Sequence, residues 1–437
     1  MWGWGGPLLF LTAASRRSTS HTGNLARWRH PVSTYLSRLM ALYRERLYIP
    51  EDIDIVVRYP FSMLLGFRFA DVPPWGYLIG PPGGLKSTIL LSMQDIPDVV
   101  CAGEWITRAG VMSGWRDDPP KKKKKNLSAP EDARAKFSLG PLVHDKMLVI
   151  HDWTQLTGSD MKDMKPVLNQ LRLLFEGHAS PRYGNIEGFT EERAHFSLIA
   201  GVTHEIDRIR TSQTALGERF LGFRYNPGPG VEDAARSIDN VLTGGKRWRD
   251  GLSKRIAEVV KDIPAVTPQD LFVSPAIRKT LTYMGSAAAW LRANVAVIHR
   301  GGSQVEVLYR PEPERATRIA PQALLVAMGH AILNRRTRLE AEDLALARSV
   351  LWGSIPDRPL TFALALHHAP NSTVAQISAL TRYPPYSVVT GLESLVVLNV
   401  CTRERVENMG YYRLSNEFAE AASQGRFFEG ELCCGKS

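Results

Sequence analysis

Short apolar runs alternate with helical patterns over the first half of the chain. Runs of four or five apolar residues predict buried strands, because both faces of a strand in a parallel sheet are covered. Such runs occur at 75–79, 147–150 and 196–200. Helical periodicity occurs at 32–48, 88–93 and 161–176. This alternation predicts an α/β fold with a parallel sheet and helices on both faces.

From about residue 231 the pattern becomes mostly helical. Near the end, three helical segments precede two strand patterns, which predicts a winged helix-turn-helix; they lie at 360–367, 373–380, 386–398, 400–405 and 411–414. A polar stretch with prolines and no periodicity, residues 116–137, predicts a flexible insertion. The predicted regions are a leader and helix (1–48), an α/β core (49–230), a helical lid (231–357), the winged helix (358–422) and a tail (423–437).

The composition is that of a globular protein with more than one domain. The chain has 437 residues, of which 44% are hydrophobic and 22% are charged. No apolar run approaches the roughly 20 residues that span a bilayer, so we expect a soluble, cytoplasmic protein that binds no membrane. The four cysteines show no CxxC spacing, which indicates reduced thiols.

The net charge of +10 favours polyanionic partners, and much of it lies near the N-terminus. Residues 1–50 contain seven arginines and one acid, a net charge of 7 − 1 = +6. An arginine-rich leader with few acids leaves an organellar presequence open as an alternative. A start at Met40 is a third possibility, although the helical pattern of residues 32–48 crosses that position.

A glycine-rich loop follows the first predicted strand directly. We call residues 80–88 the glycine-rich loop: Gly80, Pro81, Pro82, Gly83, Gly84, Leu85, Lys86, Ser87 and Thr88. A strand, a glycine-rich turn and the start of a helix together form a phosphate site, because backbone N–H groups point at the phosphates. In such a site Lys86 contacts the β- and γ-phosphates, while Ser87 and Asp152, after the next strand, hold Mg²⁺. The cofactors predicted are therefore ATP and Mg²⁺.

Two positions depart from the usual pattern of such a site. Leu85 stands where glycine normally precedes the lysine. If the backbone there is left-handed, leucine costs roughly 1–2 kcal/mol. Trp153 stands where a glutamate usually follows the aspartate and orients the attacking water. Either another acid, such as Glu176 or Glu104, orients the water, or hydrolysis is slow.

Several of these segments resemble AAA+ ATPases. The glycine-rich loop resembles the AAA+ sequence GPPGTGKT, and Leu-Gly-Glu-Arg-Phe at 216–220 resembles the second region of homology. This resemblance implies that Arg219 reaches the nucleotide of a neighbouring subunit, so that copies of the chain form a ring, perhaps a hexamer. The segment 196–203 is similar to the strand that ends in the sensor 1 residue, which implies that role for Thr203.

Two further segments resemble minichromosome-maintenance and superfamily 3 helicases. Residues 174–184 are similar to the pre-sensor hairpin, which implies that Arg182 faces DNA, although an ordinary surface loop fits equally well. Residues 323–347 are similar to the helical lid, which implies a sensor 2 role for Arg318 at the nucleotide. The arrangement over residues 50–225 also resembles ATPases that phages and integrative elements encode.

Other basic residues are candidates for DNA contact. One set is the lysine run of the insertion: Lys121, Lys122, Lys123, Lys124 and Lys125. A solvated loop is the alternative for this run. The third helix of the predicted winged helix has no lysine or arginine, and Arg403 and Arg405 are basic residues of the wing. Because phosphate neutralisation supplies most non-specific affinity, DNA binding and protein docking both remain open for this unit.

The sequence therefore predicts an ATPase that is associated with DNA. The first hypothesis is an AAA+ helicase, translocase or replication-type factor of a phage or mobile element. The alternative is a nucleotide-gated regulator or adaptor that acts through the winged helix with little hydrolysis. Leu85 and Trp153 favour the alternative, because both affect turnover more than binding.

Overall fold

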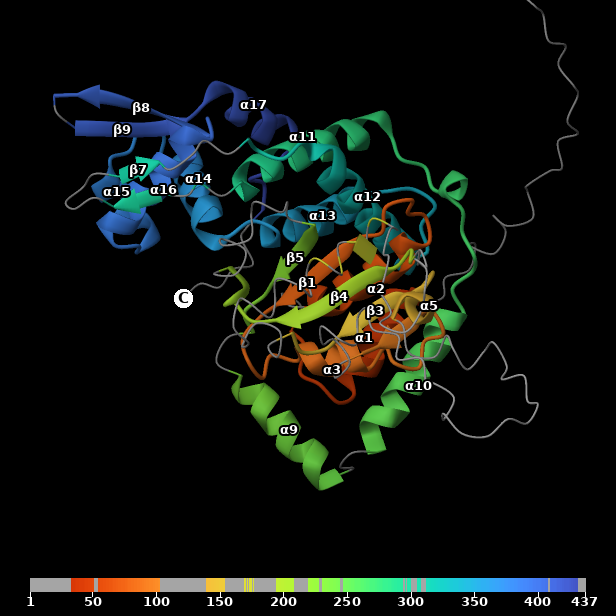
Figure 1. Cartoon of the computed structure of the whole chain (residues 1–437). Coiled ribbons are helices and arrows are strands. Elements are labelled where there is room, and N and C mark those ends of the chain that lie inside the picture. Colours follow the sequence, from red (N-terminus) through yellow and green to blue (C-terminus); the bar gives the residue numbers. More distant parts are fainter. Residues whose placement is uncertain are drawn as a thin grey trace, which may run out of the picture. The chain divides into compact units, whose positions relative to one another are not determined.

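The computed structural model describes most of the chain, and the described part lies almost entirely in one compact unit, residues 34–437 (Figure 1). The described residues are 33–50, 54–102, 139–153, 169, 171, 173–174, 176, 194–207, 219–227, 230–243, 247–293, 295, 297–299, 305–307, 312–407 and 409–430. The leader up to residue 32 and the insertion at 116–137 lie outside these residues, so their interpretations stay predictions.

The centre of the unit is a five-stranded sheet (Figure 1). Its strands are β1 (Trp75–Ile79), β2 (Val99–Cys101), β3 (Met147–Ile150), β4 (Ser197–Val202) and β5 (Phe220–Arg224). They pair in the order β2-β3-β4-β1-β5, and every pair is parallel. The prediction of an α/β fold with a parallel sheet is thus confirmed. The sequence pattern revealed β1, β3 and β4 but neither β2 nor β5.

The two faces of the sheet belong to two separate hydrophobic clusters. Alternate strand residues such as Leu78 and Ile199 join the larger cluster, which contains residues of α2 (Ile55–Phe67), α3 (Lys86–Leu91) and many later helices. Their neighbours Tyr77 and Leu198 join the smaller cluster with Leu139 of α5 (Leu139–Val143). Because successive strand residues point to opposite faces, the burial of every residue of β1, β3, β4 and β5 indicates a sheet covered on both sides.

The helical region after β5 shares its core with the start of the chain. It contains α9 (Val231–Thr243), α10 (Arg247–Lys261), η6 (Pro268–Asp270), α11 (Pro275–Arg292), a β6–β7 pair (Val297–His299, Val305–Val307), α12 (Ala316–Leu333) and α13 (Ala341–Gly353). The helix α12 packs along α2, while α1 (Tyr35–Arg44) packs on α10. A Cβ added to Gly66 would lie 2.1 Å from the Leu325 carbonyl oxygen, so α2 and α12 approach too closely for a side chain there.

One helix passes a length and composition test for a membrane span. It is α12, and most of that helix is buried inside the unit. Since α2, α11 and α13 pack against it, its apolar residues have protein neighbours. Among the described residues, α12 is the single helix that passes this test.

The C-terminal region contains three helices and an antiparallel hairpin. These are α14 (Asp357–His368), α15 (Val374–Thr381), α16 (Pro385–Val397), β8 (Cys401–Val406) and β9 (Met409–Leu414). The helix α17 (Asn416–Gln424) then packs on α11. Phe427 is fully buried, and its carbonyl accepts a hydrogen bond from the Trp352 indole at 3.0 Å. Residues that the sequence suggested as part of a tail are therefore packed into the core.

Candidate functional site

Three strands of the sheet end at one edge, and the predicted site residues follow them there. The glycine-rich loop follows β1, Asp152 comes two residues after β3, and Thr203 comes directly after β4. Since β3, β4 and β1 are neighbours and parallel, their carboxyl ends share one edge, which we call the carboxyl edge. In open α/β sheets, ligands bind at this edge.

The glycine-rich loop turns tightly before α3. Gly83 and Leu85 both have a left-handed backbone, with φ of 75° and 66°. The Gly84 N–H donates to the Pro81 carbonyl at 3.2 Å, and the Leu85 N–H donates to the Gly83 carbonyl at 3.1 Å. The left-handed backbone considered for Leu85 from the sequence is therefore present, and a leucine occupies a conformation that favours glycine.

Lys86 is held inside the turn that precedes it. Its side chain is mostly buried, and its Nζ donates to the carbonyl oxygens of Gly80 at 2.8 Å and Pro81 at 2.5 Å. Burial lowers the pKa of the amino group, and the negative charge of Asp152 opposes this shift. Both of these acceptors are neutral carbonyls, and a buried cation with such partners gains from an anionic ligand beside it.

Ser87 and Asp152 form a set of oxygen donors next to this lysine. The Ser87 hydroxyl donates to the His151 carbonyl at 3.2 Å, which ties the start of α3 to the end of β3, one residue before Asp152. The His151 Nδ1 is buried without a hydrogen-bond partner. One hydroxyl and one carboxylate fit Mg²⁺, which takes its other ligands from phosphates and water. The described residues contain no cluster of three or more acidic, histidine or cysteine ligands.

Tyr225 packs against the glycine-rich loop, and the sequence did not suggest it. Its backbone N–H donates to the Ile79 carbonyl at 3.0 Å, so it lies beside the start of the loop. A Cβ at Gly80 would lie 2.6 Å from the Tyr225 ring. Burial raises the pKa of the Tyr225 hydroxyl. Glycine at position 80 therefore makes room for a buried aromatic ring beneath the loop.

A buried ion pair lies next to Thr203 at the same edge. Arg224 ends β5 and donates to the Asp207 carboxylate at 2.6 Å and to the Ile355 carbonyl at 3.2 Å. His204 follows Thr203, and its pKa is lowered, first by burial and then by the charge of Arg224. Ile355 immediately precedes the C-terminal helices, so Arg224 connects the carboxyl edge to that region. The sequence did not suggest this role for Arg224. Prediction of β5 would have placed Arg224 at the carboxyl edge and made it a candidate.

Arg219 lies at the opposite edge of the sheet. It immediately precedes β5, whose first residue pairs with Trp75 and whose last pairs with Ile79. At about 3.3 Å per residue, roughly 16 Å of strand separates Arg219 from the carboxyl edge. Arg219 forms an ion pair with Glu176. We call this side, where the strands begin, the amino edge.

The amino edge also holds two residues that were predicted near the nucleotide. Glu176 pairs with Arg219, so it is remote from Lys86 of the same chain and is a poor candidate for orienting water there. The positive charge of Arg318 contributes to lowering the pKa of Arg219, after burial, so Arg318 lies within electrostatic reach of Arg219. Its sensor 2 role stays a prediction, and from this edge Arg318, like Arg219, is remote from Lys86 of the same chain.

Trp153 is part of the core. It is 1% exposed and packs edge-on against Tyr77 and Phe220, with ring centroids 6.0 and 6.1 Å apart. The side chain after Asp152 thus points into the apolar cluster of one sheet face. A glutamate there would need burial in an apolar layer, which costs several kcal/mol for an unpaired charge.

Of the residues predicted to contact nucleic acid, the structure describes only Arg403 and Arg405. Arg182 and the lysines at 121–125 lie outside the described residues, as does Glu104. Arg403 pairs with Glu393 of α16 at 2.9 Å, and the same carboxylate accepts a hydrogen bond from Tyr412 at 2.7 Å. Arg405 is exposed on β8. The predicted wing therefore carries two exposed arginines that form no ion pair with a described residue, Arg405 and Arg413 of β9, and one, Arg403, that an acid partly neutralises.

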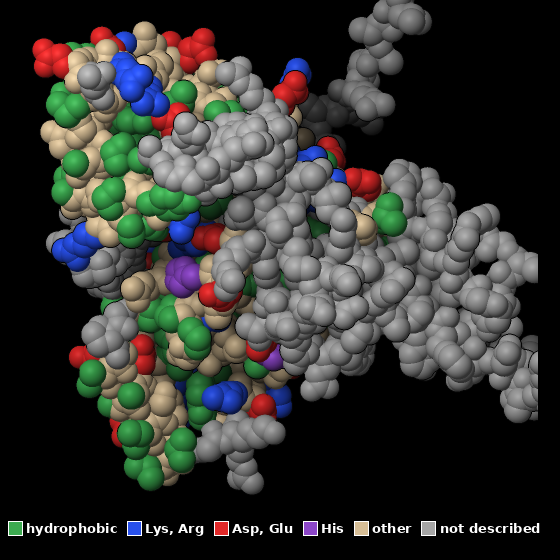
Figure 2. All heavy atoms as spheres, turned by 60° about the vertical axis from the view of Figure 1, so that its left-hand side comes forward, with side chains coloured by type: hydrophobic (Ala, Val, Ile, Leu, Met, Phe, Trp, Pro, Cys, Tyr) green, Lys and Arg blue, Asp and Glu red, His purple; other side chains and the backbone are tan. Residues whose placement is uncertain are grey.

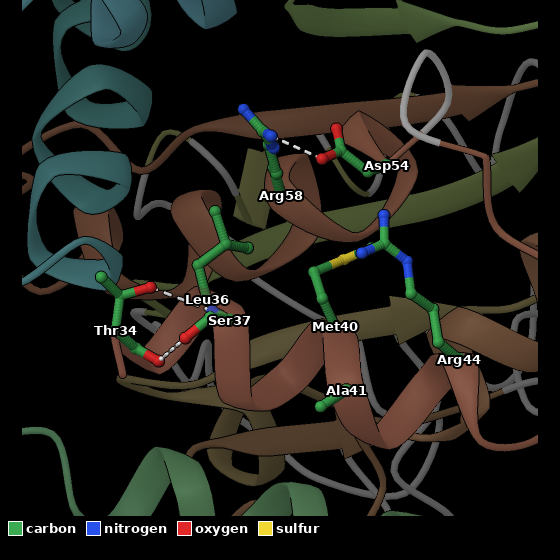
Figure 3. Close-up of a pocket in the computed structure, with 8 residues that line it drawn as sticks. All are labelled: Thr34, Leu36, Ser37, Met40, Ala41, Arg44, Asp54 and Arg58. Carbon is green, nitrogen blue, oxygen red and sulfur yellow. Dashed lines mark hydrogen bonds and ion pairs between the residues drawn. The ribbon is translucent and has the colours of Figure 1, made fainter. Parts of the chain in front are cut away.

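A pocket of about 420 Å³ lies between α1 and the start of α2 (Figure 3). Thr34, Ser37, Met40 and Arg44 line it from α1 and its cap, and the Arg58–Asp54 ion pair lines it from α2. Burial raises the pKa of the Asp54 carboxyl, while the charge of Arg58 opposes the shift. None of the residues predicted from the sequence lines this pocket.

Comparison with known proteins does not assign the chain to a family. A scan against protein-family models finds no match to the chain. A search of curated proteins also finds no significant match. The candidate site therefore rests on the residues of the carboxyl edge, Gly80 to Ser87, Asp152 and Thr203.

Proposed function

We propose that the chain binds ATP with Mg²⁺ at the carboxyl edge of the sheet and hydrolyses it as an AAA+-type ATPase associated with DNA. The observation that carries this proposal is the buried Lys86 at the end of a left-handed glycine-rich turn, with Ser87 and Asp152 beside it. A lysine whose bonds among the described residues go to two carbonyl oxygens is suited to exchange them for phosphate oxygens.

Each residue has a role that follows from its position. The amino group of Lys86 binds the β- and γ-phosphates, and backbone N–H groups of the glycine-rich loop bind them from the other side. Ser87 and Asp152 hold Mg²⁺, which neutralises charge that develops on the phosphates. Thr203 follows the neighbouring strand and orients the terminal phosphate or the attacking water. Arg219 lies too far from the nucleotide of its own chain, so its proposed role requires the nucleotide of a neighbouring copy in a ring and release from its ion pair with Glu176.

DNA association rests on weaker support than ATP binding. The net charge of +10 and the exposed Arg405 favour a polyanion. Three helices followed by an antiparallel hairpin suit a winged helix-turn-helix in the C-terminal region. The Arg403–Glu393 pair weakens its electrostatic attraction for DNA.

A nucleotide-gated regulator with little hydrolysis is the second candidate. Two observations favour it. Trp153 is buried in the core, so no carboxylate follows Asp152 to orient water. Arg224 joins the carboxyl edge to the Ile355 carbonyl just before α14, which provides a route from nucleotide occupancy to the C-terminal region.

Binding of a fluorescent ATP analogue with Mg²⁺ tests the proposal. Lys86→Ala should weaken binding roughly a hundredfold, since charged hydrogen bonds contribute about 1.5–3 kcal/mol each and 1.4 kcal/mol is a factor of ten. Lys279→Ala, which removes an exposed lysine on α11, is the matched control and should bind normally. A wild-type chain that binds no nucleotide would refute both candidates.

ATP turnover with and without DNA separates the two candidates. A motor should hydrolyse ATP faster when DNA is present, and this stimulation should disappear in Lys86→Ala. A regulator should bind ATP with negligible turnover under both conditions. In that case DNA or partner binding by the full chain should change with the nucleotide supplied.

A further inference from the structure

A short turn follows β4 at the carboxyl edge and presents two titratable side chains. The Ile206 N–H donates to the Thr203 carbonyl at 3.1 Å, and the Asp207 N–H donates to the His204 carbonyl at 3.2 Å. Ile206 is buried in the smaller hydrophobic cluster, which anchors the turn. The side chains of His204 and Glu205 are exposed. These two side chains therefore meet solvent from a turn that is fixed to the core.

Two backbone hydrogen bonds place this turn between the glycine-rich loop and Asp152. Where the loop begins, the Gly80 N–H donates to the Val202 carbonyl at 3.1 Å. Directly after Asp152, the Trp153 N–H donates to the Gly201 carbonyl at 3.0 Å. Since β4 pairs with β1 on one side and with β3 on the other, the chain leaves β4 between the two parts of the candidate nucleotide site.

The charged groups that affect His204 come from its own turn, the glycine-rich loop, β5 and α14. Although the ring reaches solvent, partial burial lowers its pKa, and the charge of Arg224 lowers it further. The carboxylates of Asp207 and Asp357 oppose this shift, whereas the charge of Lys86 adds to it. The pKa of His204 therefore lies below its ordinary value of 6.5, so the imidazole is mostly neutral at pH 7.

The imidazole of His204 is available to water or to a ligand. Among the described residues, none forms a hydrogen bond with this ring. In Figure 1 the arrow of β4 points to the left, and Figure 2 turns that side of the molecule forward. Histidine and charged side chains lie at the surface in this view. A neutral imidazole has one unprotonated nitrogen, which accepts a hydrogen bond from water.

Hydrolysis at the carboxyl edge needs a group that orients the attacking water and takes its proton. This step rests on the proposed function. Trp153 is buried in the core and Glu176 lies at the amino edge, so neither supplies that group. Asp152 holds Mg²⁺ in the proposed site. His204 has the required properties, namely a neutral ring, an available nitrogen and a position directly after Thr203.

We propose that His204 is the general base of ATP hydrolysis in this protein. Its imidazole accepts a proton from the attacking water, whose oxygen forms a bond to the γ-phosphorus. The bond between that phosphorus and the oxygen shared with the β-phosphate breaks, and ADP leaves with that oxygen. The carboxylates of Asp207 and Asp357 stabilise the imidazolium that forms, which then releases its proton to solvent. The products are ADP, phosphate and one proton.

Measurements of turnover and binding on the full chain test this role. His204→Ala should lower kcat about a hundredfold, the lower end of what a general base contributes. The affinity for a fluorescent ATP analogue should stay within about threefold, because the neutral ring acts on water and not on the phosphates. His368→Ala removes an exposed histidine of α14 and is the matched control, which should hydrolyse ATP like wild type. Both side chains are exposed, so both variants should keep the wild-type melting temperature.

The pH dependence of kcat/KM gives a readout that a merely structural role would not change. This quantity reports ionisation of the free enzyme, and a base acts only when it is unprotonated. In wild type it should fall about tenfold for each pH unit below the pKa of His204, which lies under 6.5. His204→Gln holds water but takes up no proton, so its lower activity should lack this decline, whereas His368→Ala should keep it.

Glu205 is the competing candidate on the same turn. Glu205→Gln removes its charge, keeps its length and should hydrolyse ATP like wild type. A large loss of turnover in Glu205→Gln, with His204→Ala unaffected, would assign the base to Glu205 and overturn the proposal.

The remaining outcomes separate this inference from the proposed function. If His204→Ala hydrolyses ATP like wild type, or if His204→Gln keeps the decline at low pH, His204 is not the base. If wild type binds the ATP analogue without turnover, the inference fails while the nucleotide site stands. If wild type binds no nucleotide, the proposed function fails and this inference fails with it.

Discussion

The carboxyl edge of the sheet and the C-terminal region differ in the exposure of their basic residues. At the carboxyl edge, Lys86 and Arg224 are buried, and their hydrogen bonds go to carbonyl oxygens and one carboxylate. In the C-terminal region, Arg405 lies exposed on β8, and Arg403 is half-exposed beside Glu393.

This difference in exposure indicates that basic side chains are held in place at the carboxyl edge and are free to move on the C-terminal hairpin. Burying a cation is costly unless its surroundings compensate for the lost water, so the burial of Lys86 inside a glycine-rich turn favours the ligand site that we propose there. Exposed charges cost little and contribute little. We therefore expect substitutions at the sheet to have large effects and substitutions in the C-terminal region to have small ones.

The largest effect should come from removing Arg219. Because a trans-acting arginine stabilises charge in the transition state, Arg219→Ala should lower ATP turnover by about a thousandfold. ATP affinity should change little, because the residue lies at the amino edge of its own chain. Steady-state hydrolysis and equilibrium binding measure the two quantities. Equal losses in both would contradict a role confined to turnover, and Lys279→Ala, at an exposed lysine of α11, serves as a control.

A smaller effect should follow from restoring glycine before the lysine. Leu85 has φ of 66°, a conformation that costs leucine roughly 1–2 kcal/mol more than glycine. Leu85→Gly should relieve this strain and raise turnover by letting the backbone bring Lys86 closer to the phosphates, whereas the strain energy itself should appear in stability. ATP affinity should stay within a factor of three. The reverse substitution at a neighbouring left-handed position, Gly83→Ala, should lower stability in urea denaturation. Turnover unchanged by Leu85→Gly would show that Leu85 does not limit hydrolysis.

The smallest effect should come from the C-terminal hairpin. Glu393→Gln removes the charge that pairs with Arg403 and keeps an acceptor for Tyr412. If this surface binds DNA, the affinity at low salt should rise several-fold, because an exposed ion pair contributes less than about 1 kcal/mol. Fluorescence anisotropy with a duplex at several salt concentrations measures this, and Glu417→Gln on α17 is the control. An unchanged or lower affinity would contradict the expectation that the Arg403–Glu393 pair weakens DNA binding at this surface.

The sequence predicted the sheet where strands are long and apolar on both faces. β1, β3 and β4 carry such runs, and each ends next to a predicted site residue. β5 was missed because its first residue, Phe220, ends the segment 216–220 that resembled an AAA+ motif, and because glycine at position 222 interrupts the apolar run. That glycine is required by contact: a Cβ there would lie 2.3 Å from the Gly353 carbonyl oxygen.

The candidate site was predicted only in part. The positions of the glycine-rich loop and Asp152 could be predicted from the order of residues. Each comes soon after a predicted strand, and the end of that strand determines where the residues that follow it lie. The positions of Glu176 and Arg318 did not follow, since both depend on packing between segments far apart in the chain. The sequence did not suggest Tyr225 and Arg224. Both lie at the carboxyl edge because β5 pairs in parallel with β1, and the sequence did not reveal that pairing.

The sequence by itself thus determined the local chemistry: apolar strands, a glycine-rich turn before Lys86, and an aspartate after the next strand. These depend on residues adjacent in the chain, whose geometry the backbone limits. The tertiary structure decided which groups share an edge, why Trp153 occupies an acid's usual position, and which charges surround His204. These depend on strand order and on contacts between distant segments, which a pattern along one chain does not encode.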